Sequence, residues 1–274
     1  MKIARYWTRG DGEAWTSKGE RIRATARGWS DESIDAARAV ASGIARRVAE
    51  RIAAGSSGQR YPYGDRPLPE PLIREFSSGQ GIVTRNAYGA LVLNAARLLF
   101  ADIDGQPAGA GLGNIFSGLF GKPKSDPLVE RVKAITERHG RKARLYRTAA
   151  GYRLMIVDAP YRPGDAETES LLEEYKADPL YRRLCRTQES FRARLTPKPW
   201  RCGMLNPPAE FPFETTIARE QFAVWEREYN AKTQRFATCK LVAEVGSGRP
   251  AEEFRELIDY HDRETKAGQE LPLA

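Results

Sequence analysis

The apolar residues of this chain occur in short runs, and none approaches the ~20 residues of a membrane-spanning helix. Two of the longest, at 87–93 and 98–101, are bounded by asparagine, arginine or aspartate. Along the chain the spacing of these runs changes repeatedly between the period of two typical of strands and the period of 3.6 typical of helices. This order predicts an α+β or α/β protein rather than a helix bundle, and no membrane span.

The first 60 residues are predicted to form a β-β-α unit. Residues 2–9 and 20–29 have the composition of two strands, joined by a polar turn at "RGDGE". A helix is expected from about 31 to 54, with Ser30 as its N-cap and with apolar residues at helical spacing: Ile34, Ala37, Ala41, Ile44, Val48 and Ile52. A proline-rich connection at 61–71 leads into the core at 61–274, so the chain forms either two units or one continuous domain.

The core is predicted to be α+β. We expect two or three strands within 81–104, a glycine-rich surface loop at 105–124 and a helix within 125–140. Strands at 142–148 and 152–160 precede a helical region at about 165–193 that breaks near "KADP", and the following segment is a loop or edge strand because it contains two prolines. A helix at 217–232, a strand at 236–245 and a helix at 250–266 complete one mixed or antiparallel sheet of about five to eight strands with packed helices.

The net charge of the chain indicates which kinds of ligand it could bind. The 274 residues include 44 Lys and Arg against 36 Asp and Glu, a formal net charge of +8, and most of the cations are arginine. This excess suits DNA, RNA or a nucleotide, although many cytosolic proteins of basic pI bind none of these. Three cysteines without a C-x-x-C pair, and only two histidines, argue against structural zinc and for free thiols. The N-terminus lacks an apolar signal core, so a cytoplasmic location is expected.

Two carboxylates, Asp102 and Asp104, end a predicted strand in "LLFADIDG". Alternate residues of a strand project from the same face, with Cα atoms roughly 6.5–7 Å apart, so both carboxylates can converge on one cation. The pair predicts a Mg²⁺ or Mn²⁺ site suited to phosphoryl or nucleotidyl transfer. In the alternative interpretation, D-x-D-G merely ends a strand in a turn.

Two other segments supply candidate phosphate ligands. Arg147, Thr148 and Arg153 flank the turn in "LYRTAAGYRLMIV", where they could face the aspartate pair, or could belong to an ordinary hairpin with solvated arginines. The segment "FRARLTPKPWRCG" interleaves cations with aromatic residues, which is typical of sites that stack bases and hold phosphates; its candidates are Arg192, Arg194, Lys198, Trp200 and Arg201. In the alternative, its aromatics are core residues and its cations a solvated rim.

Other polar residues carry weaker indications. Thr84, Arg85 and Asn86 could reach a phosphate or simply form a turn. His261 and Asp262 are adjacent on a predicted helix and are not expected to face each other, so neither His261 nor His139 is predicted to be catalytic. The sequence contains no G-x-x-x-x-G-K-[ST], G-x-S-x-G or H-E-x-x-H motif, which weighs against P-loop, hydrolase and zinc-protease classes.

Over about residues 82–203 the chain resembles the archaeo-eukaryotic primase and primase-polymerase superfamily. "LLFADID" matches its apolar-D-x-D motif, and "YRTAAGYRL" is similar to its second motif, with Arg153 where the family has a nucleotide-binding histidine. Asp158 is the candidate for the third acidic residue. The phrases "TRNAYG", "ADPLYRRLCR" and "FRARLTPKPWRCG" are also similar to those of a group of uncharacterised bacterial proteins.

The resemblance implies a core sheet like that of an RNA-recognition motif, with helices behind it. If the protein is an enzyme, we expect Asp102, Asp104 and Asp158 to hold the metal and Arg153 to act with them. The missing histidine leaves open a non-catalytic module that binds nucleic acid or a protein partner, and a purely structural protein is a third possibility.

Overall fold

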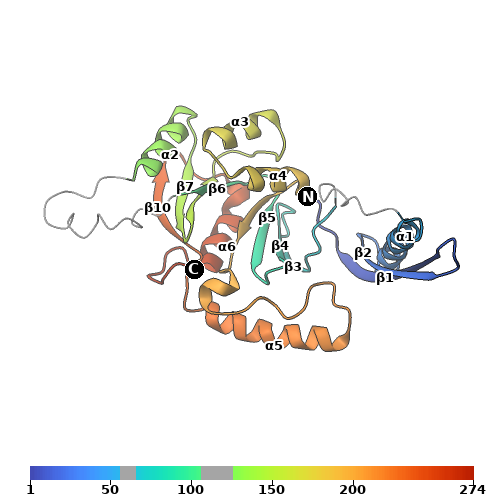
Figure 1. The fold of residues 1–274 in the computed structure, drawn as a ribbon. Coiled ribbons are helices and arrows are strands. Elements are labelled where there is room, and N and C mark those ends of the chain that lie inside the picture. Colours follow the sequence, from blue (N-terminus) through green and yellow to red (C-terminus); the bar gives the residue numbers. More distant parts are fainter. Residues whose placement is uncertain (56–65, 106–125) are drawn as a thin grey trace, which may run out of the picture.

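The structure is a computed structural model that describes residues 1–55, 66–105 and 126–274. Within these ranges it contains ten strands in three antiparallel sheets, together with six α-helices (Figure 1). The predicted α+β class is confirmed. The strands form sheets of two, four and four members rather than one sheet of five to eight. The predicted loop at 105–124 lies almost entirely outside the described residues.

The N-terminal unit consists of β1 (Tyr6–Trp15), β2 (Arg21–Ser30) and α1 (Ile34–Ala53), which confirms the predicted β-β-α order. The strands pair antiparallel, and α1 packs on one face of this hairpin. The helix begins later than predicted: Ser33, not Ser30, caps it, accepting a hydrogen bond from the backbone N–H of Ala36 at 3.1 Å.

The predicted turn at "RGDGE" is wrong, because β1 runs through it and the chain reverses at 16–20. Gly10 and Gly12 of this segment, with Gly28 of β2, lie against α1. A Cβ atom at Gly12 or Gly28 would overlap backbone atoms of the helix. These glycines therefore permit close helix–strand packing and do not form a turn.

The core contains two four-stranded sheets, named here by a central strand. The β8 sheet has the order β10 (Cys239–Val245), β7 (Ala143–Thr148), β8 (Gly151–Ile156), β6 (Leu99–Asp104). The β5 sheet has the order β3 (Leu72–Glu75), β4 (Gly81–Arg85), β5 (Leu91–Ala95), β9 (Phe191–Arg194). The edge strands β6 and β9 are in contact, so the two sheets meet there. Strand β9 begins inside the region predicted to be helical to about 193, because α4 already ends at Gln188. It lies at the edge of its sheet, one of the two alternatives, loop or edge strand, expected for the proline-containing segment.

Helix α6 (Arg255–Thr265) lies between the two sheets (Figure 1). His261 packs on Phe100 of β6, with ring centroids 5.5 Å apart, and Tyr260 packs on Phe76 at 5.1 Å. Tyr152 of β8 donates a hydrogen bond to Asp126, the N-cap residue of α2 (Pro127–Arg138). Helix α6 and helix α2 therefore approach the β8 sheet from opposite faces, because Tyr152 alternates with Arg153.

The remaining helices complete the core. They are α3 (Ala166–Glu174), α4 (Pro179–Gln188) and α5 (Thr216–Thr233), with short 3₁₀ turns at Pro199–Cys202 and Glu252–Phe254. The break predicted at "KADP" separates α3 from α4. Helix α5 carries a second apolar cluster, which includes Trp225, Tyr229, Cys202 and Met204. The three cysteines are free, as predicted, and all three are buried. None of the helices described is long and apolar enough to cross a bilayer.

Candidate functional site

The pairing of β6 with β8 places Asp102 opposite Arg153. Arg153 Nε donates to Asp102 Oδ1 at 3.0 Å, and Nη1 donates to the carbonyl oxygen of Arg194 at 2.8 Å. Burial lowers the pKa of the Arg153 guanidinium, but the charge of Asp102 and its hydrogen bond outweigh burial, so the net pKa is raised. This cation links the β8 sheet to strand β9.

The position of Arg153 corrects its predicted role. Only 1% of its surface is exposed, and its guanidinium is already engaged by Asp102 and the Arg194 carbonyl. A phosphate could reach it only if the contact between the two sheets opened. Arg153 is therefore a structural bridge and not the phosphate-binding or catalytic residue that the sequence predicted.

Three further cations lie next to this bridge: Arg194, Lys198 and Arg201, here called the cation cluster. Arg194 ends β9, and Lys198 and Arg201 lie at the 3₁₀ turn that follows. None of the three forms an ion pair with any described residue, and Arg194 Nε is buried without a hydrogen-bond partner. A buried guanidinium nitrogen that lacks an acceptor costs free energy, and a bound anion would offset that cost.

The charges of these groups act on one another. Burial and repulsion from Arg153 lower the pKa of Arg194 to about 10, and Asp102 opposes this only in part. Burial and repulsion from Arg194 and Arg201 lower the pKa of Lys198. Asp102 and the four cations therefore share one environment with excess positive charge, which favours an anionic ligand.

Two aromatic rings border the cation cluster. Trp200 is 48% exposed and Tyr88 46% exposed, and their ring centroids are 5.2 Å apart in an edge-to-face arrangement. The ammonium of Lys198 lies 5.2 Å from the centroid of the Trp200 ring. The sequence predicted Trp200 but not Tyr88, since no local pattern shows that a turn after β4 meets a turn after β9.

The predicted metal site is only partly assembled. Asp104 projects from the same strand face as Asp102, is exposed, and has no ion pair among the described residues. Asp158 follows the other end of β8, seven residues beyond Gly151, which pairs with Asp104; this is roughly 23 Å along an extended chain. In the described ranges no group of three or more His, Cys, Asp or Glu side chains could hold a metal ion. Asp158 therefore does not complete a site with Asp102 and Asp104.

Arg147 and Thr148 also lie outside the cluster. Arg147 pairs across the hairpin with Tyr152, the neighbour of Arg153, and so projects from the opposite face. Its guanidinium lies 4.6 Å from the Tyr152 ring centroid and 4.0 Å from Asp126. The Thr148 hydroxyl accepts a hydrogen bond from the Gly151 N–H at 3.1 Å, which makes it a turn residue.

Arg192 differs sharply from Arg194 although both lie on β9. Its Nη2 donates to both carboxylate oxygens of Glu70, at 2.7 and 2.9 Å, and its Nη1 donates to Asn94 Oδ1 at 2.6 Å. Thr84 donates to the same Glu70 carboxylate. Arg192 and Glu70 are both buried, so Arg192 stabilises the β5 sheet and does not bind a ligand, contrary to prediction.

The other polar residues before β5 are also internal. Arg85 donates to the Gly89 carbonyl and to Glu226. Asn86 Oδ1 accepts from the backbone N–H groups of Tyr88 and Ala90, at 3.0 and 3.1 Å. Of the three residues Thr84, Arg85 and Asn86, only Asn86 lies in a turn, as the second interpretation expected, whereas Thr84 and Arg85 belong to strand β4.

A buried network joins α6 to the β8 sheet. His261 Nδ1 lies 2.9 Å from Asp262 Oδ1, so these neighbours do contact each other, contrary to prediction. Tyr146 and Arg144 donate to the Asp262 carboxylate at 2.7 and 2.6 Å. Arg153 Nη1 lies 3.4 Å from His261 Nε2. Because a guanidinium only donates, Nε2 must accept and the Nδ1–H donates to Asp262.

Burial, reinforced by the positive charge of Arg153, keeps His261 neutral and lowers its pKa from the usual 6.5. The unfolded chain therefore takes up this proton before the folded protein does. We expect the free energy of unfolding to fall as the pH drops from 6.5 to 5, by up to ~1.4 kcal/mol per pH unit.

Urea unfolding followed by circular dichroism at several pH values measures this slope. His261→Gln should reduce the slope of unfolding free energy against pH between pH 5 and 6.5. His139→Gln, on the surface, should leave that slope unchanged. An unchanged slope in His261→Gln would contradict the assignment.

Comparison of the chain with protein-family models, with curated proteins and with solved structures returns no match. The resemblance to primase-polymerases, and the core sheet it implies, stay predictions from the sequence. Fold and site therefore define the protein by its physical character: an α+β protein with a cluster of cations that form no ion pair with the residues described.

Proposed function

We propose that this protein binds phosphate groups of a nucleotide or nucleic acid at the cation cluster. The observation that carries the proposal is the buried Nε of Arg194, which has no hydrogen-bond partner among the described residues. A phosphate oxygen would supply both the missing acceptor and the missing negative charge. The depressed pKa of Arg194, about 10, supports the same conclusion, because an anion would reverse that shift.

The exposed rings of Trp200 and Tyr88 favour a nucleotide or nucleic acid over an inorganic anion. Nucleobases stack on aromatic side chains, and stacking adds to the attraction of nearby cations for the phosphates. The formal net charge of +8 would assist the approach of such a ligand. The free, buried thiols accord with a reducing compartment, so we infer a cytoplasmic location.

Metal-dependent nucleotidyl or phosphoryl transfer is the second candidate, favoured by Asp102 and Asp104 on one strand face. The residues present fit a metal poorly. One oxygen of Asp102 already accepts from Arg153, and Asp158 lies at the far end of β8. We therefore derive no catalytic step, and we propose binding that needs neither Mg²⁺ nor Mn²⁺.

Arg194→Met tests the proposal. We expect affinity for a fluorescein-labelled single-stranded oligonucleotide to fall about 10- to 100-fold, the loss expected for charged hydrogen bonds. The urea midpoint should stay the same or rise, because the variant removes a desolvated charge that Asp102 offsets only in part. Fluorescence anisotropy and urea unfolding measure the two effects.

Arg255→Met is the matched control, since it removes an arginine from an exposed pair with Glu252. Its affinity should change by less than about threefold, as expected for loss of one remote, screened charge. If Arg194→Met lowers stability and leaves affinity unchanged, Arg194 is structural and the proposal fails. Thermal unfolding with and without Mn²⁺ distinguishes metal-dependent chemistry from metal-free binding. A rise in melting temperature with Mn²⁺ that Asp104→Asn abolishes would favour metal-dependent chemistry.

A further inference from the structure

The β1–β2 hairpin turns one face toward α1 and its outer face away. Five residue pairs make up the outer face: Trp7 with Trp29, Arg9 with Arg27, Asp11 with Thr25, Glu13 with Arg23, and Trp15 with Arg21. This face therefore holds three of the chain's five tryptophans and four arginines, against two acids. Arginine interleaved with tryptophan on a sheet is typical of nucleic-acid-binding surfaces.

The half of the outer face next to the turn is open. Trp15 is 62% exposed. Arg21 and Arg23 both pair with Glu13, so two guanidiniums share one carboxylate. The open half thus offers a flat aromatic ring beside excess positive charge.

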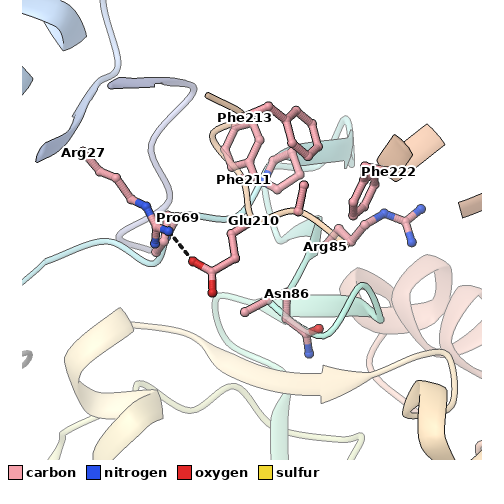
Figure 2. Close-up of a pocket in the computed structure, with 11 residues that line it drawn as sticks. Arg27, Pro69, Arg85, Asn86, Glu210, Phe211, Phe213 and Phe222 are labelled. Carbon is pink, nitrogen blue, oxygen red and sulfur yellow. Dashed lines mark hydrogen bonds and ion pairs between the residues drawn. The ribbon is translucent and has the colours of Figure 1, made fainter. Parts of the chain in front are cut away.

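The other half is covered by the 209–214 segment that precedes α5. Glu214 pairs with Arg9 and Glu210 pairs with Arg27, the contact drawn in Figure 2. Arg9 Nε also donates to the Pro212 carbonyl at 2.8 Å. The two arginines face each other across the strands, so the two glutamates occupy positions that successive phosphates of a strand could take.

This covering contact is weakly packed. Glu210 and Glu214 are 69% and 64% exposed, and exposed ion pairs contribute little stability and weaken with salt. The hollow beside the Arg27–Glu210 pair, lined by Phe211 and Phe213, measures about 40 Å³ (Figure 2). That volume has room for only a few water molecules, so it is a gap in the contact and not a ligand pocket.

We propose that the outer face of the hairpin binds a nucleic-acid strand, separately from the cation cluster. Trp15 stacks on a base, and Arg21 and Arg23 contact phosphates. Glu210 and Glu214 occupy the phosphate positions at Arg9 and Arg27 until the strand displaces them.

The test compares Glu210→Gln/Glu214→Gln with the parent protein, using the labelled oligonucleotide at several salt concentrations. We expect three- to tenfold tighter binding at low salt. Two additional phosphate contacts should steepen the plot of log affinity against log salt by about 1.4. Adding Arg9→Ala/Arg27→Ala to this variant should abolish both the tighter binding and the steeper salt dependence. Trp15→Ala alone should weaken binding about fivefold or more.

Glu130→Gln/Glu173→Gln is the matched control, because both are exposed glutamates in ion pairs on α2 and α3, outside the hairpin and the segment that covers it. An equal gain in this control would overturn the proposal, since net charge alone would explain it. Equal competition by poly-glutamate would indicate an acidic protein partner, and dissociation of an oligomer by Trp15→Ala would indicate contacts between copies; either result also overturns it. Arg194→Met distinguishes the hairpin surface from the cation cluster. In that background, Glu210→Gln/Glu214→Gln should still tighten binding and steepen its salt dependence.

Discussion

Arg192→Met is expected to lower the free energy of unfolding by about 3–5 kcal/mol, because it leaves the Glu70 carboxylate buried without its partner. Two hydrogen bonds from Arg192 and one from Thr84 hold that carboxylate in the β5 sheet. Urea unfolding followed by circular dichroism measures the loss as a lower midpoint at an unchanged slope.

The double variant Glu70→Gln/Arg192→Met should recover much of this loss, because the buried charge is removed with its partner. Arg38→Met, which breaks an exposed pair with Asp35, should cost no more than about 1 kcal/mol. If the double variant were as unstable as Arg192→Met, the loss would come from packing of the arginine stem and not from the charge.

Gly28→Val is expected to separate α1 from the β1–β2 hairpin. A Cβ at Gly28 would overlap the carbonyl oxygen of Ala37 and the backbone of Ala41. No rotamer relieves a backbone overlap, so the cost should exceed the roughly 1–3 kcal/mol typical of overpacking. Hydrogen exchange should show protection lost in α1 and the hairpin but kept in β6 and β8, since the elements of the N-terminal unit pack mainly on one another.

Gly43→Ala provides the control within the same helix. Its Cβ would meet only the Arg47 guanidinium, at 3.6 Å, and alanine favours a helix over glycine by roughly 0.5–1 kcal/mol. We therefore expect unchanged or higher protection in α1. Normal protection in Gly28→Val would show that the helix can shift along the hairpin.

Local patterns predicted much of the fold. Period-two and period-3.6 spacing identified the β-β-α unit, the strands that became β6, β7 and β8, and the break between α3 and α4. The turn at "RGDGE" failed because glycine signals both a turn and a close approach of backbones. Only the position of α1 distinguishes these two uses at Gly10 and Gly12.

The candidate site was less accessible to sequence reasoning. Asp102 at a strand end, and the cations Arg194, Lys198 and Arg201, were identified and do lie together. Arg153 was also identified, but the sequence could not predict that it is buried. Its burial depends on where β9 meets β6. Arg147 would have been set aside had the strand register been known, since it projects from the other face.

By itself the sequence determined an α+β chain with excess positive charge, paired aspartates at a strand end, and arginines set among aromatic residues. Those properties follow from composition and from the periods of strand and helix, which are local. Tertiary structure alone decided that Arg192 meets Glu70, 122 positions away, while Arg194 meets no carboxylate among the described residues. The reason is physical: whether a buried acid reaches an arginine depends on how the sheets pack together, and no local pattern in the sequence records that packing.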